Sequence, residues 1–346
     1  MSSTSRRAAV AAVAIAAGVL AAPGAASAHS GQDAATVASA ELIKGLYQSD
    51  YSQRNKALWV TAAVGRPPVT SSALLKVDPK TLEIEATITP PVTNETTGAV
   101  EAVYGVGVDD EYNRVWVTAT RNNAVAVYDQ RTGAHVASFA NVPHAREIVV
   151  DEKHNTVWAS AFTSGELVAY DSKTLVEKKR VVVEGAGPTG LVVDEKTGTL
   201  YAADLNNDRI IEVSPKAETP RFIATGDGPI SIDLSADGKT AYTANQTAGS
   251  VSFVNLKKGT VTAEVATGAG ALSVAYEERS GTVLVANRTA ATVTVVDATT
   301  AVVEENLVTA ANPNHIETAN GKAYAVDKSG AGATGGDFIY KIDPAN

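Results

Sequence analysis

Few residues of this chain have the types and spacing that chemistry requires. The histidines lie far apart, at His29, His135, His144, His154 and His315. None belongs to an HExxH or similar zinc-ligand pattern, and none of the 346 residues is a cysteine. The chain also lacks a G-x-S-x-G nucleophile elbow and a Walker phosphate loop. The sequence therefore predicts no cofactor and no resident metal ion.

A more informative group of residues stands at one recurring position, where short runs of β-forming residues begin. The group comprises Tyr47, Tyr104, His144, Arg146, Glu147, Thr189, Asn314 and His315. Charged and aromatic side chains that converge at one opening form the usual ligand site of a protein. We therefore interpret these eight residues as ligand-binding candidates. The alternative is that Arg146 and Glu147 pair with each other or with neighbouring elements and only stabilise the fold.

The elements that must position these residues form a repeat. Residues 105–139 show its unit, four short runs of alternating apolar and small polar residues, separated by turns rich in Gly, Asn and Asp. The large residues of the second run are Trp59, Trp116, Trp158, Tyr201, Tyr242, Leu284 and Tyr324, and after the first gap of 57 residues they lie 40 to 43 residues apart. This period predicts an all-β fold, a seven-bladed β-propeller of four-stranded antiparallel blades.

The last repeat lacks its fourth run before the chain stops at Asn346. Residues 36–43 align with the fourth run of an earlier repeat at 260–268, so we predict that they supply the missing outer strand and close the ring. The alternative for this segment is a short amphipathic helix. We expect residues 29–346 to form one propeller domain, with 29–35 flexible.

The ends of the second runs resemble a known repeat. They read YTAN (242–245), LVAN (284–287), YAAD (201–204) and YAVD (324–327), similar to the Tyr-Val-Thr-Asn motif of the YVTN family of β-propellers. Residues 51–63 and the following LLKVDPKTLEI resemble the first blade of the YncE-like exported propellers within it. The resemblance covers essentially the whole chain after residue 28. It implies the propeller fold and not an activity, because the motif residues are expected to shape turns.

Residues 1–28 have the pattern of an export signal. Arg6 and Arg7 precede an apolar run of about 15 residues, and Ala26-Ser27-Ala28 matches a signal peptidase site. The run is shorter than the ~20 residues that usually span a bilayer. We therefore expect a cleaved signal and a secreted or periplasmic protein with no membrane span after cleavage. An N-terminal membrane anchor is the alternative, and the general and twin-arginine routes both stay open.

The charge of the chain bears on its partners. The formal net charge is −9 and becomes −11 when Arg6 and Arg7 leave with the signal. An acidic protein is poorly suited to broad, non-specific nucleic-acid binding, which depends on Lys and Arg at phosphates. Separately, we expect the protein to be a monomer.

Three insertions interrupt the otherwise regular repeat. The second and third runs are separated by about six extra residues in the first and last repeats, and residues 90–101 lengthen the link between repeats one and two. Ring closure would make these repeats neighbours, and repeat proteins often bind partners through such insertions. The partner-binding candidates on them are Arg66, Pro67, Pro68, Asn94, Glu95 and Lys328.

Three functions follow as hypotheses. We favour an exported, non-catalytic binding protein whose partner is a protein, a glycan or a small molecule. The second is a lactonase- or lyase-like enzyme in which Arg146, Glu147 and His315 act at the channel mouth, and only this hypothesis admits a divalent metal ion. The third is binding of single-stranded nucleic acid, as proposed for YncE-like propellers, which would need a basic, aromatic face.

Overall fold

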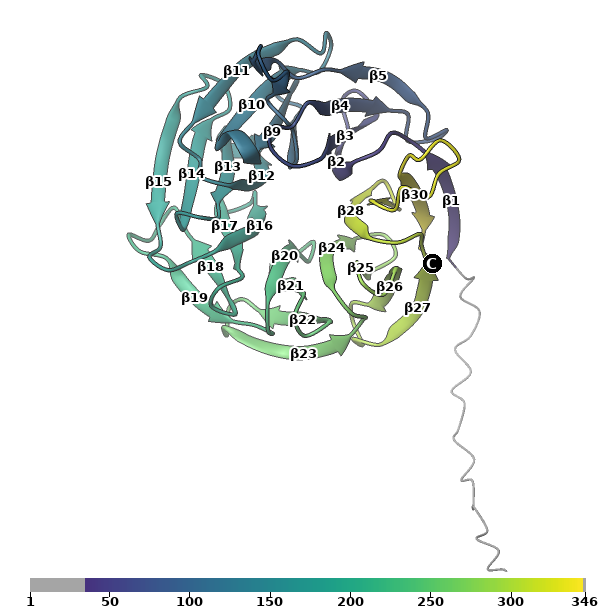
Figure 1. Ribbon diagram of the computed structural model, residues 1–346. Coiled ribbons are helices and arrows are strands. Elements are labelled where there is room, and N and C mark those ends of the chain that lie inside the picture. The colour runs from purple at the N-terminus through teal and green to yellow at the C-terminus, as the bar shows by residue number, and fades with distance from the viewer. Residues whose placement is uncertain (1–34, 345–346) are drawn as a thin grey trace, which may run out of the picture. The chain divides into compact units, whose positions relative to one another are not determined.

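The computed structural model describes residues 35–344. Within this part of the chain, seven four-stranded antiparallel sheets surround one axis and form the predicted seven-bladed propeller (Figure 1). The helical segments among these residues are two short 3₁₀ turns, Thr120–Asn122 and Glu152–His154. None of the helices described here is long and apolar enough to cross a membrane. The expected export signal, and most of the expected flexible segment 29–35, lie outside the described residues.

Each blade runs from an inner strand at the axis to an outer strand at the rim. Blades one to three contain β2 (Leu46–Ser52), β3 (Ala57–Val64), β4 (Ser71–Val77), β5 (Ile84–Ile88); β8 (Val106–Asp109), β9 (Arg114–Ala119), β10 (Ala124–Asp129), β11 (His135–Ala140); β12 (Ala145–Asp151), β13 (Thr156–Ala161), β14 (Glu166–Asp171) and β15 (Glu177–Val182). Blades four to six contain β16 (Pro188–Asp194), β17 (Thr199–Asp204), β18 (Arg209–Val213), β19 (Arg221–Ala224); β20 (Pro229–Leu234), β21 (Thr240–Asn245), β22 (Ser250–Asn255), β23 (Thr260–Ala266); β24 (Ala271–Glu277), β25 (Thr282–Asn287), β26 (Thr292–Asp297) and β27 (Val303–Val308).

The seventh blade joins the two ends of the described chain. It consists of β28 (Pro313–Ala319), β29 (Lys322–Asp327), β30 (Phe338–Asp343) and β1 (Thr36–Glu41). The strand β1 pairs antiparallel with β30 over its whole length, from Thr36 opposite Asp343 to Glu41 opposite Phe338 (Figure 1). The predicted closure is confirmed, and the segment is a strand and not a helix.

The core lies between the blades. The seven large residues that mark the repeat stand in the second strands and are all buried, with exposed fractions of 0% at Trp116 and Leu284 and at most 7% elsewhere. Side chains from adjacent second strands and from the strands beside them form separate apolar clusters, one for each space between neighbouring sheets. No blade buries both of its faces alone, which is why the fold needs the complete ring.

The motif Asp and Asn residues at the ends of the second strands serve the turns, as expected. The Asp204 carboxylate accepts the Gly187 N–H at 2.8 Å, and the Asp327 carboxylate accepts the N–H of Ser329 and of Phe338. At the other end of the blades, the Asp78 carboxylate accepts the N–H groups two and three residues later. These side chains fix local backbone and leave the ring face to other residues.

Candidate ligand site at the channel mouth

The inner strands deliver the candidate residues through a repeated backbone irregularity. Six of the seven inner strands have a register shift near their first residues, as between Leu46 and Ser49 in β2 and between Ala145 and Ile148 in β12. A β-bulge places an extra residue outside the regular alternation and turns its side chain. The bulges of β2, β12, β16 and β28 carry Tyr47, Arg146, Glu147, Thr189 and Asn314.

The eight predicted residues come together. Tyr47, Tyr104, His144, Arg146, Glu147, Thr189, Asn314 and His315 all line one cavity of about 210 Å³, which we call the mouth cavity. The convergence predicted from the repeat is thus present in the structure. The sequence did not single out two further lining residues, Arg121 and Arg288, because their role at the opening depends on how neighbouring blades pack.

The mouth cavity is electrically positive. Burial lowers the pKa of His144, and the nearby Arg146 and Arg121 lower it further. Burial also lowers the pKa of Arg146, an effect that Glu147 partly offsets. Among the described residues that line this cavity, Glu147 is the single carboxylate, while Arg121, Arg146 and Arg288 are permanent cations.

Aromatic rings hold two cations in place, Arg146 in the mouth cavity and Lys328 beside it. The Arg146 guanidinium lies over the Phe162 ring, 5.4 Å from its centroid. The Lys328 ammonium lies 3.5 Å from the centroid of Tyr47, whose ring meets Tyr104 edge-on at 4.7 Å. A cation over an aromatic face is attracted to the ring without losing its charge to a carboxylate.

Two hydrogen bonds from β2 connect residues of different blades where the mouth cavity is deepest. Gln48 donates through Nε2 to the Glu147 carboxylate at 2.8 Å, and the Ser49 N–H donates to His315 Nδ1 at 3.3 Å. This bond leaves the His315 proton on Nε2, and burial lowers the pKa of that histidine to about 4, so it is neutral at pH 7. Burial raises the pKa of Glu147 to about 7. Blades seven and three are not neighbours, yet His315 and Glu147 both bond to β2, through the consecutive residues Ser49 and Gln48.

Glycine in blade two makes this arrangement possible. A Cβ atom added at Gly105 would lie 2.7 Å from the Arg146 carbonyl oxygen and 3.0 Å from Gln48 Oε1. Any other residue at this position would therefore push β12 or Gln48 away. Gly105 lets Gln48 of blade one reach past blade two to Glu147 of blade three.

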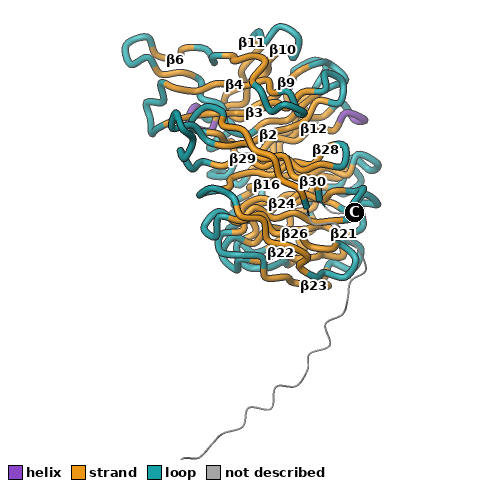
Figure 2. The backbone as a smooth tube through the Cα atoms, turned by 90° about the vertical axis from the view of Figure 1, so that its right-hand side faces the viewer, coloured by secondary structure: helices purple, strands orange, loops and turns teal. Residues whose placement is uncertain are grey.

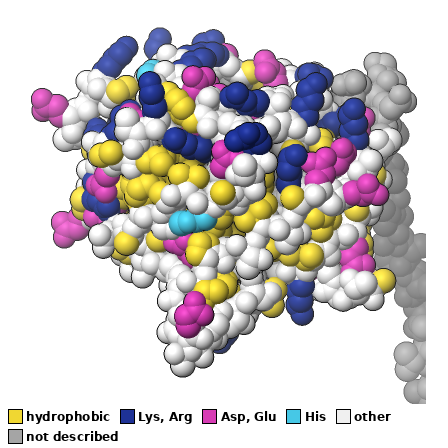
Figure 3. Space-filling model, turned by 90° about the horizontal axis from the view of Figure 1, so that it is seen from above, with side chains coloured by type: hydrophobic (Ala, Val, Ile, Leu, Met, Phe, Trp, Pro, Cys, Tyr) yellow, Lys and Arg dark blue, Asp and Glu magenta, His cyan; other side chains and the backbone are white. Residues whose placement is uncertain are grey.

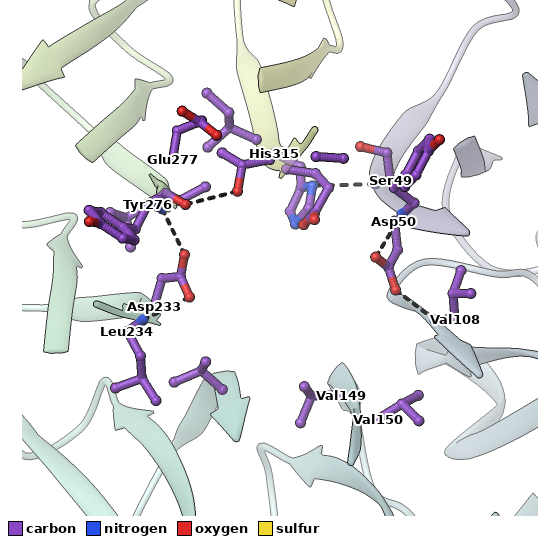
Figure 4. A pocket seen from close by; sticks show the side chains of 18 of the residues that line it. Ser49, Asp50, Val108, Val149, Val150, Asp233, Leu234, Tyr276, Glu277 and His315 are labelled. Carbon is purple, nitrogen blue, oxygen red and sulfur yellow. Dashed lines mark hydrogen bonds between the residues drawn. The ribbon is translucent and has the colours of Figure 1, made fainter. Parts of the chain in front are cut away.

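A second and larger cavity continues below the mouth. This inner cavity, of about 1050 Å³, shares Glu147, Gly190, Ser231 and His315 with the mouth cavity. Its acidic lining includes Asp50, Asp110, Glu152, Glu195, Asp233, Glu277, Glu278 and Glu317, against the two cations Arg54 and Arg279. Figure 4 shows Asp50 and Asp233 on opposite sides of this space.

The acids of the inner cavity tie neighbouring blades together. The Asp50 carboxylate accepts the N–H of Val108 in the next blade at 2.6 Å, and Asp233 accepts the N–H of Tyr276 at 2.7 Å (Figure 4). Burial raises the pKa of both aspartates to about 6. Burial also raises the pKa of Glu317 well above its usual value, and repulsion from Asp50 and Asp233 adds to this effect.

Sequence reasoning missed these acids, although a signal exists. Asp50, Asp233 and Glu317 stand two residues after Gln48, Ser231 and His315, so strand alternation places each pair on the same side of its strand. Among the described residues, no group of three or more His, Cys, Asp or Glu is placed to hold a metal ion.

The three insertions lie where ring closure was expected to bring them. The loop after β3 carries Arg66, Pro67 and Pro68, which are all exposed. The link between blades one and two forms a hairpin of β6 (Val92–Asn94) and β7 (Ala99–Val100) that projects from one end of the ring (Figure 2). Asn94 and Glu95 are exposed on it, and the Val100 N–H donates to the Val69 carbonyl, so these two insertions pack together.

The third insertion, between β29 and β30, serves the fold. The buried Asp337 carboxylate accepts the N–H groups of Gly45, Leu46 and Gly330. Glu41 of β1 accepts the Thr334 hydroxyl and N–H. Lys328 was expected on an exposed partner-binding edge, but it is half-buried over Tyr47 and donates to the Leu46 carbonyl at 3.1 Å. It belongs to the surroundings of the mouth cavity.

Other proteins share this architecture. A family model described as a YNCE-like beta-propeller matches residues 142–331, which is more than half of the chain. The chain belongs to the YNCE-like β-propeller family. The sequence resemblance inferred from the YTAN-type motifs is confirmed by this match.

The YncE relatives are distant and differ in coverage. Protein YncE of Escherichia coli K12 is 25% identical over 206 residues, which span 58% of this chain and 46% of that protein. Protein YncE of Salmonella typhi is 27% identical over 239 residues, 64% of this chain and 65% of that protein. The matched region thus spans about half to two thirds of these relatives.

Solved structures match in fold. Virginiamycin B lyase from Staphylococcus aureus superposes with a TM-score of 0.69 at 12% identity, over 89% of this chain and 99% of the other. The protein U3-55K superposes with a TM-score of 0.73 at 8% identity, over 89% and 98%. At these identities the likeness is one of fold alone.

Proposed function

We propose that this YncE-like propeller is an exported, non-catalytic binding protein that holds a small ligand in the mouth cavity. The observation that carries the proposal is the convergence of polar and aromatic side chains from several blades on one cavity, in which three arginines accompany a single carboxylate among the described residues. A site that is already formed and lined by such groups can hold a ligand without reorganisation of the ring.

The two cavities differ in how much of their hydrogen-bonding capacity is available. In the inner cavity, Asp50 and Asp233 already accept backbone N–H groups of the next blade. In the mouth cavity, the Arg146 guanidinium lies over a ring and forms no ion pair with any carboxylate of the described residues. Free donors favour the mouth cavity as the place where a ligand binds.

Export is supported by the sequence of residues 1–28. The basic pair Arg6-Arg7, the apolar run and Ala26-Ser27-Ala28 have the order that a signal peptidase recognises. This point is tested by expressing the full chain in a bacterium that exports proteins and measuring the mass of the recovered protein. Cleavage after Ala28 is expected, and recovery of the uncleaved chain from the cytoplasm would contradict it.

The binding role is tested with a library of small metabolites. Thermal shifts of the wild-type protein are compared with those of the double variant Arg146→Ala, Glu147→Gln. Its melting temperature without ligand should change little, because Arg146 forms no ion pair among the described residues and the glutamine side chain can still accept the hydrogen bond from Gln48. We expect some compounds to raise the melting temperature of the wild type and not of the variant. Equal shifts in both proteins, or a variant that unfolds without ligand, would overturn the proposal.

A second candidate function rests on Glu147. Its pKa of about 7 suits a general acid or base, and neutral His315 lies in the same lining. This favours an enzyme of the lactonase or lyase type as the alternative. Product formed from any ligand by the wild type, and not by Glu147→Gln, would establish it over simple binding.

A further inference from the structure

The arginines of the mouth cavity differ from most other arginines of the described chain. Arg180, Arg209 and Arg221 form ion pairs with carboxylates at 2.9, 2.8 and 3.0 Å. Arg54, Arg114 and Arg279 donate to backbone carbonyls. Among the residues that the structure describes, Arg121, Arg146 and Arg288 form no ion pair, although they line a common cavity. Three arginines accompany the single carboxylate Glu147 in this cavity, so an excess of positive charge remains that favours an anionic partner.

The central cation of this group is fixed in place. Arg146 is half-buried and is held over Phe162, and its position in the β12 bulge sets the direction of its side chain. Because the guanidinium is ordered before any ligand arrives, little conformational entropy remains to be lost on binding. Its planar fork of N–H groups matches two oxygens of a carboxylate or phosphate.

The neutral groups around Arg146 also suit an oxygen-rich anion. Ser231 Oγ accepts the Val274 N–H at 3.2 Å, and Ser273 Oγ accepts the Ile316 N–H at 3.1 Å. Each hydroxyl therefore keeps its own hydrogen for another acceptor. Both serines line the mouth cavity, and their free donors add to those of the arginines.

We propose that the mouth cavity binds a small organic anion, a carboxylate or a phosphate monoester, through the guanidinium of Arg146, with Arg121 and Arg288 adding to the attraction. This inference rests on the proposed binding function and names its ligand class. The small size of the cavity and the acidic space below it favour a compact anion over a nucleic-acid strand.

The test uses acids paired with neutral counterparts. Binding of glucuronate and glucose, of benzoate and benzamide, and of inorganic phosphate is measured by calorimetry at constant ionic strength. Figure 3 shows that Lys and Arg also gather along one edge of the outer surface, so non-specific attraction needs its own control. Arg131→Met is that control, because Arg131 is exposed, forms no ion pair among the described residues and lies outside both cavities.

We expect phosphate or at least one acid to bind the wild type and Arg131→Met equally, and its neutral counterpart not to bind. Arg146→Met should weaken this binding about tenfold or more, and Arg146→Lys should weaken it less because it keeps the charge without the fork. Equal weakening in Arg131→Met and Arg146→Met would overturn the inference. So would tight binding of an oligonucleotide without binding of phosphate or any acid. If only neutral metabolites bind, and the double variant Arg146→Ala, Glu147→Gln abolishes that binding, the ligand class is wrong while the binding function stands.

Discussion

The mouth cavity and the inner cavity are built from the same inner strands, yet their charges have opposite signs and different partners. In the mouth cavity, Arg146 lies over an aromatic ring and forms no ion pair within the described part of the chain. In the inner cavity, Asp50 and Asp233 accept backbone N–H groups from the next blade. Residues only a few positions apart on these strands thus differ in whether their hydrogen bonds are already made.

The difference teaches how to separate structural from functional polar residues in a repeat protein. A buried acid that accepts a neighbouring N–H stabilises the ring even though burial raises its pKa and penalises its charge. A preorganised cation without an acceptor adds nothing comparable to the fold. Substitution of a buried acid of this kind should lower the free energy of unfolding. Substitution of such a cation should instead weaken ligand binding.

The largest effect is expected from opening the ring, because both cavities exist only in a closed propeller. A truncated chain that begins at Leu46 lacks β1, its pairing with β30 and the Gly45 contact to Asp337. Ile339 and Ile342 of β30, which are buried in the closed ring, would then lie on an edge strand. We expect loss of about 5 kcal/mol or more, or aggregation. A cooperative melt at the wild-type temperature would show that β1 does not close the ring.

The next largest effect on stability should distinguish a residue of the inner cavity from one of the mouth cavity. Asp233→Ala leaves the Tyr276 N–H without its acceptor and should cost about 1 to 3 kcal/mol. Arg146→Met removes a contact with the Phe162 ring and no ion pair among the described residues, so it should cost less than about 1 kcal/mol. Asp233→Asn keeps an acceptor and removes the charge, so it should be no less stable than the wild type at pH 8. Urea unfolding measures all three. A larger loss in Arg146→Met than in Asp233→Ala would reverse the assignment of roles.

A third effect is expected from pH. The folded pKa values of Asp50 and Asp233, about 6, and of Glu147, about 7, lie above those of the unfolded chain. The folded protein therefore binds more protons between pH 4 and pH 7, and stability falls as pH rises through this window. The fall is at most about 3 kcal/mol for each aspartate. Urea midpoints at pH 5 and pH 8 measure it, and the double variant Asp50→Asn, Asp233→Asn should reduce it to the part that comes from Glu147. A wild type that is more stable at pH 8 would contradict the raised values.

The fold can be predicted closely from the sequence because the same pattern of four strands recurs seven times. The second-strand residues from Trp59 to Tyr324 and the unpaired last repeat were enough for blade number and closure. The convergence of the eight mouth residues could be predicted because they stand at or next to equivalent positions where the inner strands begin.

What the sequence could not show depends on contacts between different blades. The role of Asp337 follows from its contacts with Gly45 and Leu46, nearly 300 residues away. Lys328 looked like a loop residue because nothing local reveals that its ammonium lies over Tyr47. The lack of an ion pair at Arg146 is likewise a fact of three-dimensional packing, because Glu147 follows it directly in the sequence.

The most direct test of the account compares one ligand in two variants. The affinity for the best anionic probe is measured by calorimetry at pH 6 for the wild type, Arg146→Met and Asp233→Asn. The account predicts that Arg146→Met weakens binding about tenfold or more, while Asp233→Asn, which acts in the inner cavity, changes it by less than about twofold. Equal losses in the two variants, or a loss confined to Asp233→Asn, would contradict the division of the channel into a binding mouth and a structural interior.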